Sequence, residues 1–147
     1  MLLSWHSHSC VLIQTNTGKK IIIDPFISGN DLSDLDPETL QVDYIILTHA
    51  HNDHFGDTIE IAKNNDATVI AMVELADFLE KQGLKTHGMN IGGSYKFDFG
   101  KIKFTHAQHS SSLNWEGKNI LLGLAAGLLL EIDNVKDNPK LFPIVTL

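Results

Sequence analysis

The run His49-Ala50-His51-Asn52-Asp53-His54 directly follows the apolar residues Tyr44-Ile45-Ile46-Leu47. A continuous apolar run of this length is typical of a strand that is buried on both faces. Side chains two positions apart on an extended segment point the same way, so the first two histidines of the run can bind one ion. The aspartate and the last histidine follow at the start of a predicted helix and can face the same space. Imidazole and carboxylate together predict a first-row metal site, most commonly for zinc.

The segments around this run alternate between strand and helix. Apolar spacing predicts helices near residues 55–65 and 73–82, with a buried strand over 67–72 between them. Residues 11–14 and 20–24 form a predicted hairpin before the run. Strand, helix, strand and helix in succession indicate an α/β fold.

The second half of the chain has a different pattern. Residues 94–99 and 101–106 alternate between polar and apolar side chains around a glycine, which predicts an antiparallel hairpin. Residues 119–131 predict one or two further strands. This half therefore adds antiparallel strands to the α/β layer of the first half.

A third metal ligand is expected from the segment that follows the predicted strand 101–106. Three histidines and a water form a tetrahedral catalytic zinc site, and zinc lowers the pKa of its water to about 7. His109 and His106 compete for this position, and on an extended segment they point to opposite faces. We favour His109 because the serines at 110–112 are typical of a site loop, and because of the family resemblance given below.

Five more residues are candidates for the same site. Asp53 can orient or deprotonate the water as a catalytic group, or it can join His54 in holding a second ion. His6 and His8 lie two apart on a predicted strand, as a polar edge or as a wall that binds substrate or contacts a metal ligand. Asp24 ends a predicted strand, where it either starts a turn or fixes the tautomer of a ligand histidine.

Composition restricts the class of protein. The 147 residues are enough for one domain, 1–147, and the net charge of −7 with no arginine argues against a nucleic-acid partner. Cys10 is the only cysteine, so no internal disulfide is possible, which fits a reducing cytoplasm. The start lacks the features of a signal peptide, and no apolar stretch is long enough to span a membrane. We expect a cytoplasmic protein that acts on a small molecule, without a membrane partner.

The histidine run resembles the signature of the metallo-β-lactamase superfamily. The segments that carry the resemblance are 47–54, 5–9, 23–26, 91–94 and 107–111. They are similar to small metal-dependent hydrolases related to the ascorbate-6-phosphate lactonases, over residues 1 to about 132. The resemblance implies an αββα sandwich of mixed α/β (α+β) type, with the metal site at one edge of its two sheets.

The resemblance also assigns the ligands. It implies that His49, His51 and His109 bind a first metal, and that Asp53 and His54 bind a second. It implies zinc, with manganese or iron as alternatives.

The chain departs from the family pattern near its end. The family continues with an aspartate that bridges the two metals and with a later ligand histidine, whereas here no histidine follows His109. The resemblance therefore implies a shortened member that lacks roughly the second half of the fold. We expect about one zinc per chain, and an uncovered sheet face that favours a homo-oligomer.

Three functions are compatible with these residues. The first is a hydrolase that uses a zinc-bound hydroxide on an ester, lactone, amide or phosphoester bond. The second is an inactive remnant that binds one metal without catalysis. The third is an iron-dependent oxidoreductase on the same fold, because imidazole and carboxylate also suit iron.

Overall fold

The computed structural model describes residues 1–132 and, for the backbone only, residues 140–144. A six-stranded sheet holds most of the first half of the chain, in the order β1-β2-β3-β4-β5-β6. The strands β1 to β3 are antiparallel, and β3 to β6 are parallel. The bounds of the six strands are Leu2–Trp5, Val11–Gln14, Lys20–Ile23, Tyr44–Ile46, Thr68–Met72 and Lys85–Met89.

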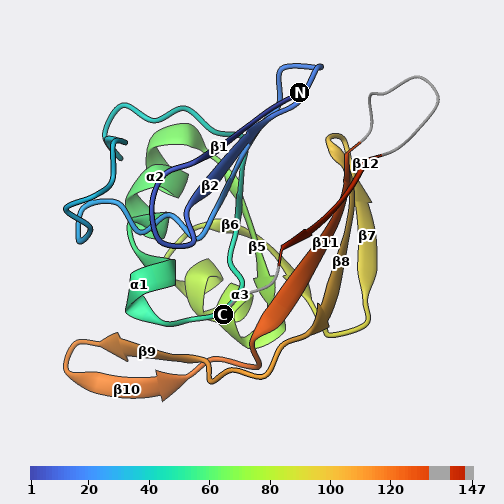
Figure 1. Cartoon of the computed structure of the whole chain (residues 1–147). Helices are drawn as coiled ribbons and strands as arrows, with labels where there is room; N and C mark the ends of the chain where they lie inside the picture. Colours follow the sequence, from blue (N-terminus) through green and yellow to red (C-terminus); the bar gives the residue numbers. More distant parts are fainter. Residues whose placement is uncertain (133–139, 145–147) are drawn as a thin grey trace.

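A second, antiparallel sheet packs on one face of the first. Its order is β12-β11-β8-β7, and its strands run over Lys140–Ile144, Ala126–Ile132, Gly100–His106 and Ser94–Phe97. The hairpin of β9 (Ser112–Trp115) and β10 (Lys118–Leu121) leaves this sheet and lies beside the first helix (Figure 1).

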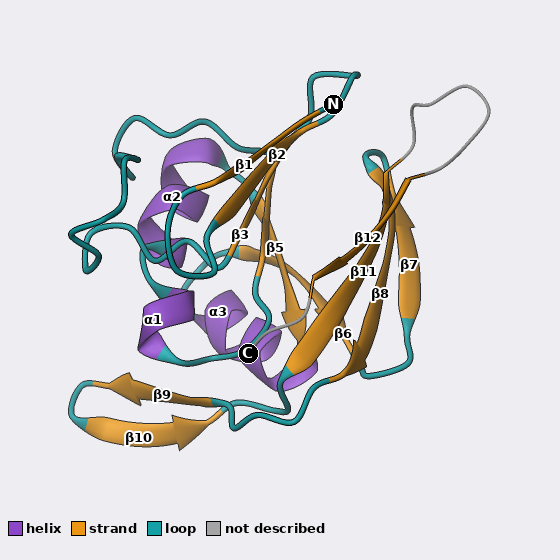
Figure 2. Cartoon of the chain, in the orientation of Figure 1, coloured by secondary structure: helices purple, strands orange, loops and turns teal. Residues whose placement is uncertain are grey.

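The described helices cover the opposite face of the six-stranded sheet (Figure 2). They are α1 (Asn52–Phe55), α2 (Thr58–Asn65) and α3 (Val73–Lys81). The described residues thus form three layers, helix on sheet on sheet, of the α/β architecture that the sequence predicts. No second helix layer covers the outer face of the four-stranded sheet within the residues described. These helices are also too short and too polar for any of them to cross a membrane.

The alternation of side chains along each strand explains why the six-stranded sheet, called the inner sheet below, is buried on both faces. On β3, Ile21 and Ile23 contribute to the core between the two sheets, whereas Ile22 contributes to the core under the helices. The same alternation places Ile46 between the sheets and Ile45 under the helices. Burying both faces fixes the register of β4, and the position of the loop that follows it.

Three local predictions need correction. The strand expected to carry His6 and His8 ends at Trp5, and the chain turns at Ser7 and His8, whose φ angles are positive at 74° and 50°. The expected helix over 55–65 is two helices, separated at Gly56 and Asp57. Residues 85–89, to which the sequence analysis assigned no strand, form β6, and the missing side chain of Gly88 lets α3 pack closely against that strand.

Candidate metal centre

The end of β4 and the short helix α1 position the histidine run. Leu47 continues the sheet by donating its backbone N–H to Ile70 O, and the chain then turns so that His49 is fully buried. His51 precedes α1 as its N-cap residue, and α1 itself carries Asp53 and His54. The run is therefore held between the inner sheet and the first helix.

Three imidazole nitrogens converge at one point. His49 Nε2 lies 3.0 Å from His51 Nδ1, and His109 Nε2 lies 3.2 Å from the same His51 atom. Two nitrogens bound tetrahedrally to zinc at about 2.0–2.1 Å stand roughly 3.3 Å apart. The three ligand atoms all lie within 4.8 Å of one another, so His49, His51 and His109 would fit one tetrahedral ion.

The second ring nitrogen of His49 and of His51 is hydrogen-bonded. Thr48 Oγ1 donates to Asp24 Oδ2 at 2.6 Å, so it is an acceptor for His49 Nδ1 at 3.0 Å. This arrangement leaves the Nε2 lone pair of His49 free toward the cluster. His51 Nε2 lies 3.1 Å from Ser110 Oγ, which leaves Nδ1 to face the same point.

Burial keeps these imidazoles neutral. Burial lowers the pKa of His49 to about 3, and the surrounding histidines add to this shift. The pKa of His51 is also lowered, by burial first and then by His109. Neutral imidazole is the form that binds metal, so His49 and His51 are ready to bind a cation at neutral pH.

A second cluster lies beside the first. It consists of His8, Asp53 and His54, whose ligand atoms all lie within 4.8 Å of one another. His54 Nδ1 donates to Asp24 Oδ2 at 2.8 Å, which leaves its Nε2 available. The rings of His54 and His49 are 4.0 Å apart between their centroids, so the two clusters are neighbours.

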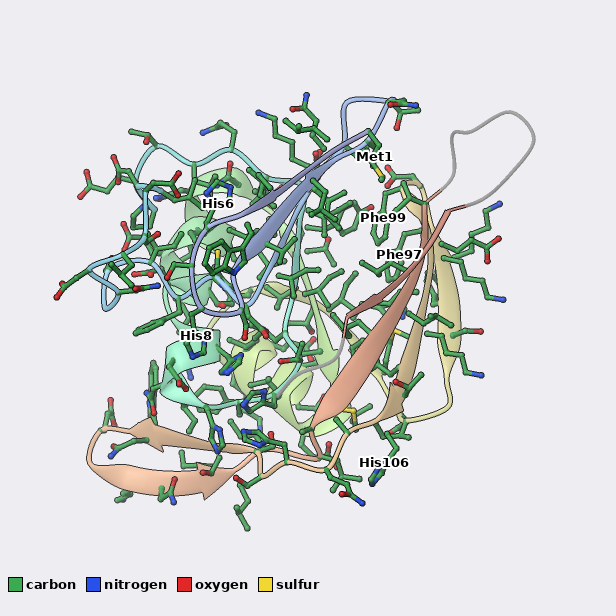
Figure 3. All side chains as sticks on the ribbon, viewed as in Figure 1. Met1, His6, His8, Phe97, Phe99 and His106 are labelled. Atoms are coloured by element: carbon green, nitrogen blue, oxygen red, sulfur yellow. The ribbon has the colours of Figure 1, made fainter. Side chains whose placement is uncertain are left out.

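The remaining sequence candidates lie outside both clusters. His6 Nδ1 pairs with Asp34 at 2.6 Å, and its Nε2 lies 2.7 Å from Ser4 Oγ. His106 is exposed at the end of β8 and lies apart from His8 (Figure 3). Of the two competing histidines, the structure brings His109 to the cluster.

Sequence reasoning missed several residues that support the site. Thr48 Oγ1 bridges Asp24 and His49 by hydrogen bonds. Its position directly before the histidine run could have indicated this role. Ser111 Oγ accepts the Ala50 N–H at 3.2 Å, which fixes the His109 loop to the histidine run. The Asn52 side chain donates a hydrogen bond to the backbone oxygen of Asn114 on β9 and accepts one from its N–H. Nothing in the sequence indicates this pairing.

Comparison with known proteins identifies the family of the chain. The profile of the metallo-beta-lactamase superfamily matches residues 3–135. The chain is 54% identical over 136 residues to a UPF0173 metal-dependent hydrolase of Staphylococcus carnosus, covering 90% of this chain and 59% of that protein. It is 56% identical over 131 residues to one of Bacillus cytotoxicus, covering 88% and 57%. The chain therefore spans less than two thirds of the length of these curated relatives.

Solved structures give the same fold. The metallo hydrolase Igni18 of Ignicoccus hospitalis matches with a TM-score of 0.75 and 31% identity, over 89% of this chain and 55% of that one. An isothiocyanate hydrolase from Delia radicum gut bacteria matches with a TM-score of 0.61 and 23% identity, over 90% and 59%, and supports the fold alone. The match over residues 3–135, together with the relatives above, places this chain in the metallo-β-lactamase superfamily.

Proposed function

We propose that this chain is a metal-dependent hydrolase in which His49, His51 and His109 bind one divalent ion, zinc by preference. The observation that carries the proposal is the approach of three imidazole nitrogens to 3.0 and 3.2 Å, near the spacing of a tetrahedral zinc site. The names of the relatives, which are metal-dependent hydrolases, support it.

The ion would act as a Lewis acid and lower the pKa of a water to about 7. The residues of the chain hold and orient the reactants. Asp53, on α1 beside the three histidines, is half exposed and serves as the carboxylate that orients this water or takes its proton. The exposed side of His109 is the approach for the substrate.

The substrate class follows from this chemistry. A water made nucleophilic at neutral pH attacks a carbonyl or phosphoryl centre, so the scissile bond is an ester, lactone, amide or phosphoester. Leu121 and Leu124 are exposed on either side of Leu122, whose N–H bonds to Ser111 O in the site loop. The buried, unpaired Cys10 thiol is in keeping with action in the cytoplasm.

The alternative is a metal-binding remnant without catalysis. The chain spans 57–59% of the length of its curated relatives, so their likeness supports the family rather than the activity of this chain. The same ligands suit iron, which would support oxidative chemistry instead. Both alternatives also bind an ion at His49, His51 and His109. Metal binding alone therefore does not distinguish them from a hydrolase.

Turnover with a matched variant tests the proposal. The full chain, taken from a size-exclusion peak and loaded with zinc, manganese or iron, is assayed on generic ester, lactone, amide and phosphoester substrates. Zinc-dependent hydrolysis that disappears in His51→Ala and persists in His106→Ala supports the hydrolase. The control removes the same side chain from an exposed position away from the cluster. Bound zinc with no turnover on any substrate supports the remnant and refutes the hydrolase.

A further inference from the structure

We propose that His8 is a metal ligand, and that it holds a second divalent ion together with Asp53 and His54. The proposal rests on the proposed function for the first ion, and it extends the ligand set to a part of the chain far from the histidine run. Sequence analysis counted only Asp53 and His54 toward a second ion, and so expected about one ion per chain. The turn after β1 supplies the third ligand that this count lacked.

The geometry of the three side chains carries the first step. His8 Nε2 stands 3.4 Å from Asp53 Oδ2, and the rings of His8 and His54 meet edge to face with centroids 4.8 Å apart. The spacing between His8 and Asp53 matches the roughly 3.3 Å that separates two ligand atoms on a tetrahedral ion. All three side chains offer a ligand atom within 4.8 Å of the others.

The backbone around His8 carries the second step. Ser7 and His8 are consecutive non-glycine residues with φ angles of 74° and 50°, a conformation that costs free energy for L residues. Three hydrogen bonds hold the turn: Cys10 N to Ser7 O at 3.0 Å, His6 N to Cys10 O at 2.9 Å, and Trp5 Nε1 to His8 O at 2.9 Å. Such strain persists where surrounding contacts over-determine it, and it clusters at functional sites.

The donor set carries the third step. The imidazoles of His8 and His54 and the carboxylate of Asp53 are ligand types that first-row divalent ions accept. The contact with Asp24 presents His54 Nε2 to this space, and it places a second carboxylate directly behind the ligand. The centroids of the His49 and His54 rings are 4.0 Å apart, so the two clusters are neighbours, as the two sites of a two-metal hydrolase must be.

The stoichiometry of bound zinc tests the proposal without an activity assay. Calorimetric titration and plasma mass spectrometry are run on the full chain, on His8→Asn and on His87→Asn. Asparagine tolerates positive φ, so His8→Asn removes the imidazole and keeps the turn. The control makes the same substitution on β6, where His87 packs on Tyr95 rather than on the site. We expect two zinc ions in the parent and in His87→Asn, and one in His8→Asn.

Two further results separate this proposal from the proposed function. A parent with a single zinc that His8→Asn retains and His51→Ala loses overturns the role of His8 and leaves the first site intact. A rise in KM in His8→Asn with two ions still bound overturns it as well, since His8 would then contact substrate. If His8→Asn does not fold by circular dichroism, His8→Gly, which also tolerates the φ of 50°, takes its place and must bind one ion. A parent that binds no zinc refutes both proposals.

Discussion

The buried carboxylate of Asp24 accepts hydrogen bonds from His54 Nδ1 at 2.8 Å and from Thr48 Oγ1 at 2.6 Å. The first contact orients a histidine of the second cluster directly. The second acts through Thr48 on His49 Nδ1, and so orients a histidine of the first cluster. One side chain at the end of β3 therefore sets the tautomer of a candidate ligand in each cluster.

Asp24→Asn is expected to weaken zinc binding by about 10- to 100-fold. An amide offers one acceptor oxygen where Asp24 accepts bonds from three donors, including Thr48 N at 2.9 Å. The dissociation constant is measured by competition with a chelating dye. Asp31→Asn, an exposed site with the same change of charge, is the control and should bind zinc as the parent does. An unchanged dissociation constant in Asp24→Asn contradicts this role.

Cys10 is expected to resist thiol reagents in the folded protein. It is fully buried, and burial raises its pKa to about 12, with further contributions from the charges of Asp24, Asp34 and Asp57. At pH 8 only about one thiol in 10⁴ is then ionised, and the thiolate is the reactive form. Reaction with a disulfide reagent should be at least about a hundredfold slower than in urea. Equal rates with and without urea would mean that the turn carrying His8 opens freely.

Gly56→Ala is expected to destabilise the fold more than Gly18→Ala. Both glycines have positive φ, at 42° and 89°, but only at Gly56 would a Cβ lie 2.2 Å from Pro25 O. We expect a loss of about 1–2 kcal/mol for Gly18→Ala from the backbone alone. For Gly56→Ala we expect about 3 kcal/mol or more, because the loop after β3 must also move. Urea denaturation measures both, and equal losses would show that the close approach to Pro25 does not matter.

The parts of the site that the sequence predicts are those fixed by local rules. His49 and His51 follow a strand whose two faces are buried, so the position of the run is tied to the core. The αβ order of the first half is likewise read from apolar periods of 2 and 3.6. These features depend on near neighbours in the chain, and a single sequence contains them.

The parts that the sequence does not predict depend on distant contacts. His8 lies beside Asp53 because Ser7 and His8 form a turn with positive φ angles. Neither serine nor histidine predicts such a turn from the sequence. The strand at residues 85–89 was missed because Gly88 lowers strand propensity, although the close approach of Val73 makes glycine suitable there. Such features follow from packing, which only the three-dimensional structure supplies.

The alkaline stability of the fold is expected to depend on Tyr44. Burial first, and then a hydrogen bond to Asp98 Oδ1 at 2.8 Å, raises the pKa of Tyr44 to about 12, against about 10 in an unfolded chain. Between these values the folded protein keeps a proton that the unfolded chain loses. The free energy of unfolding therefore falls as the pH rises from about 10 to about 12.

Tyr44→Phe removes this dependence, since phenylalanine has no proton to lose. The variant should be less stable than the parent at pH 9, by about 1 kcal/mol for the lost hydrogen bond, and the gap should narrow by pH 11.5. Urea denaturation at the two pH values measures the gap. Tyr95→Phe alters the other tyrosine of the chain, on β7, and should keep a constant difference from the parent. Parallel losses of stability in the parent and in Tyr44→Phe would show that the Tyr44 proton does not contribute.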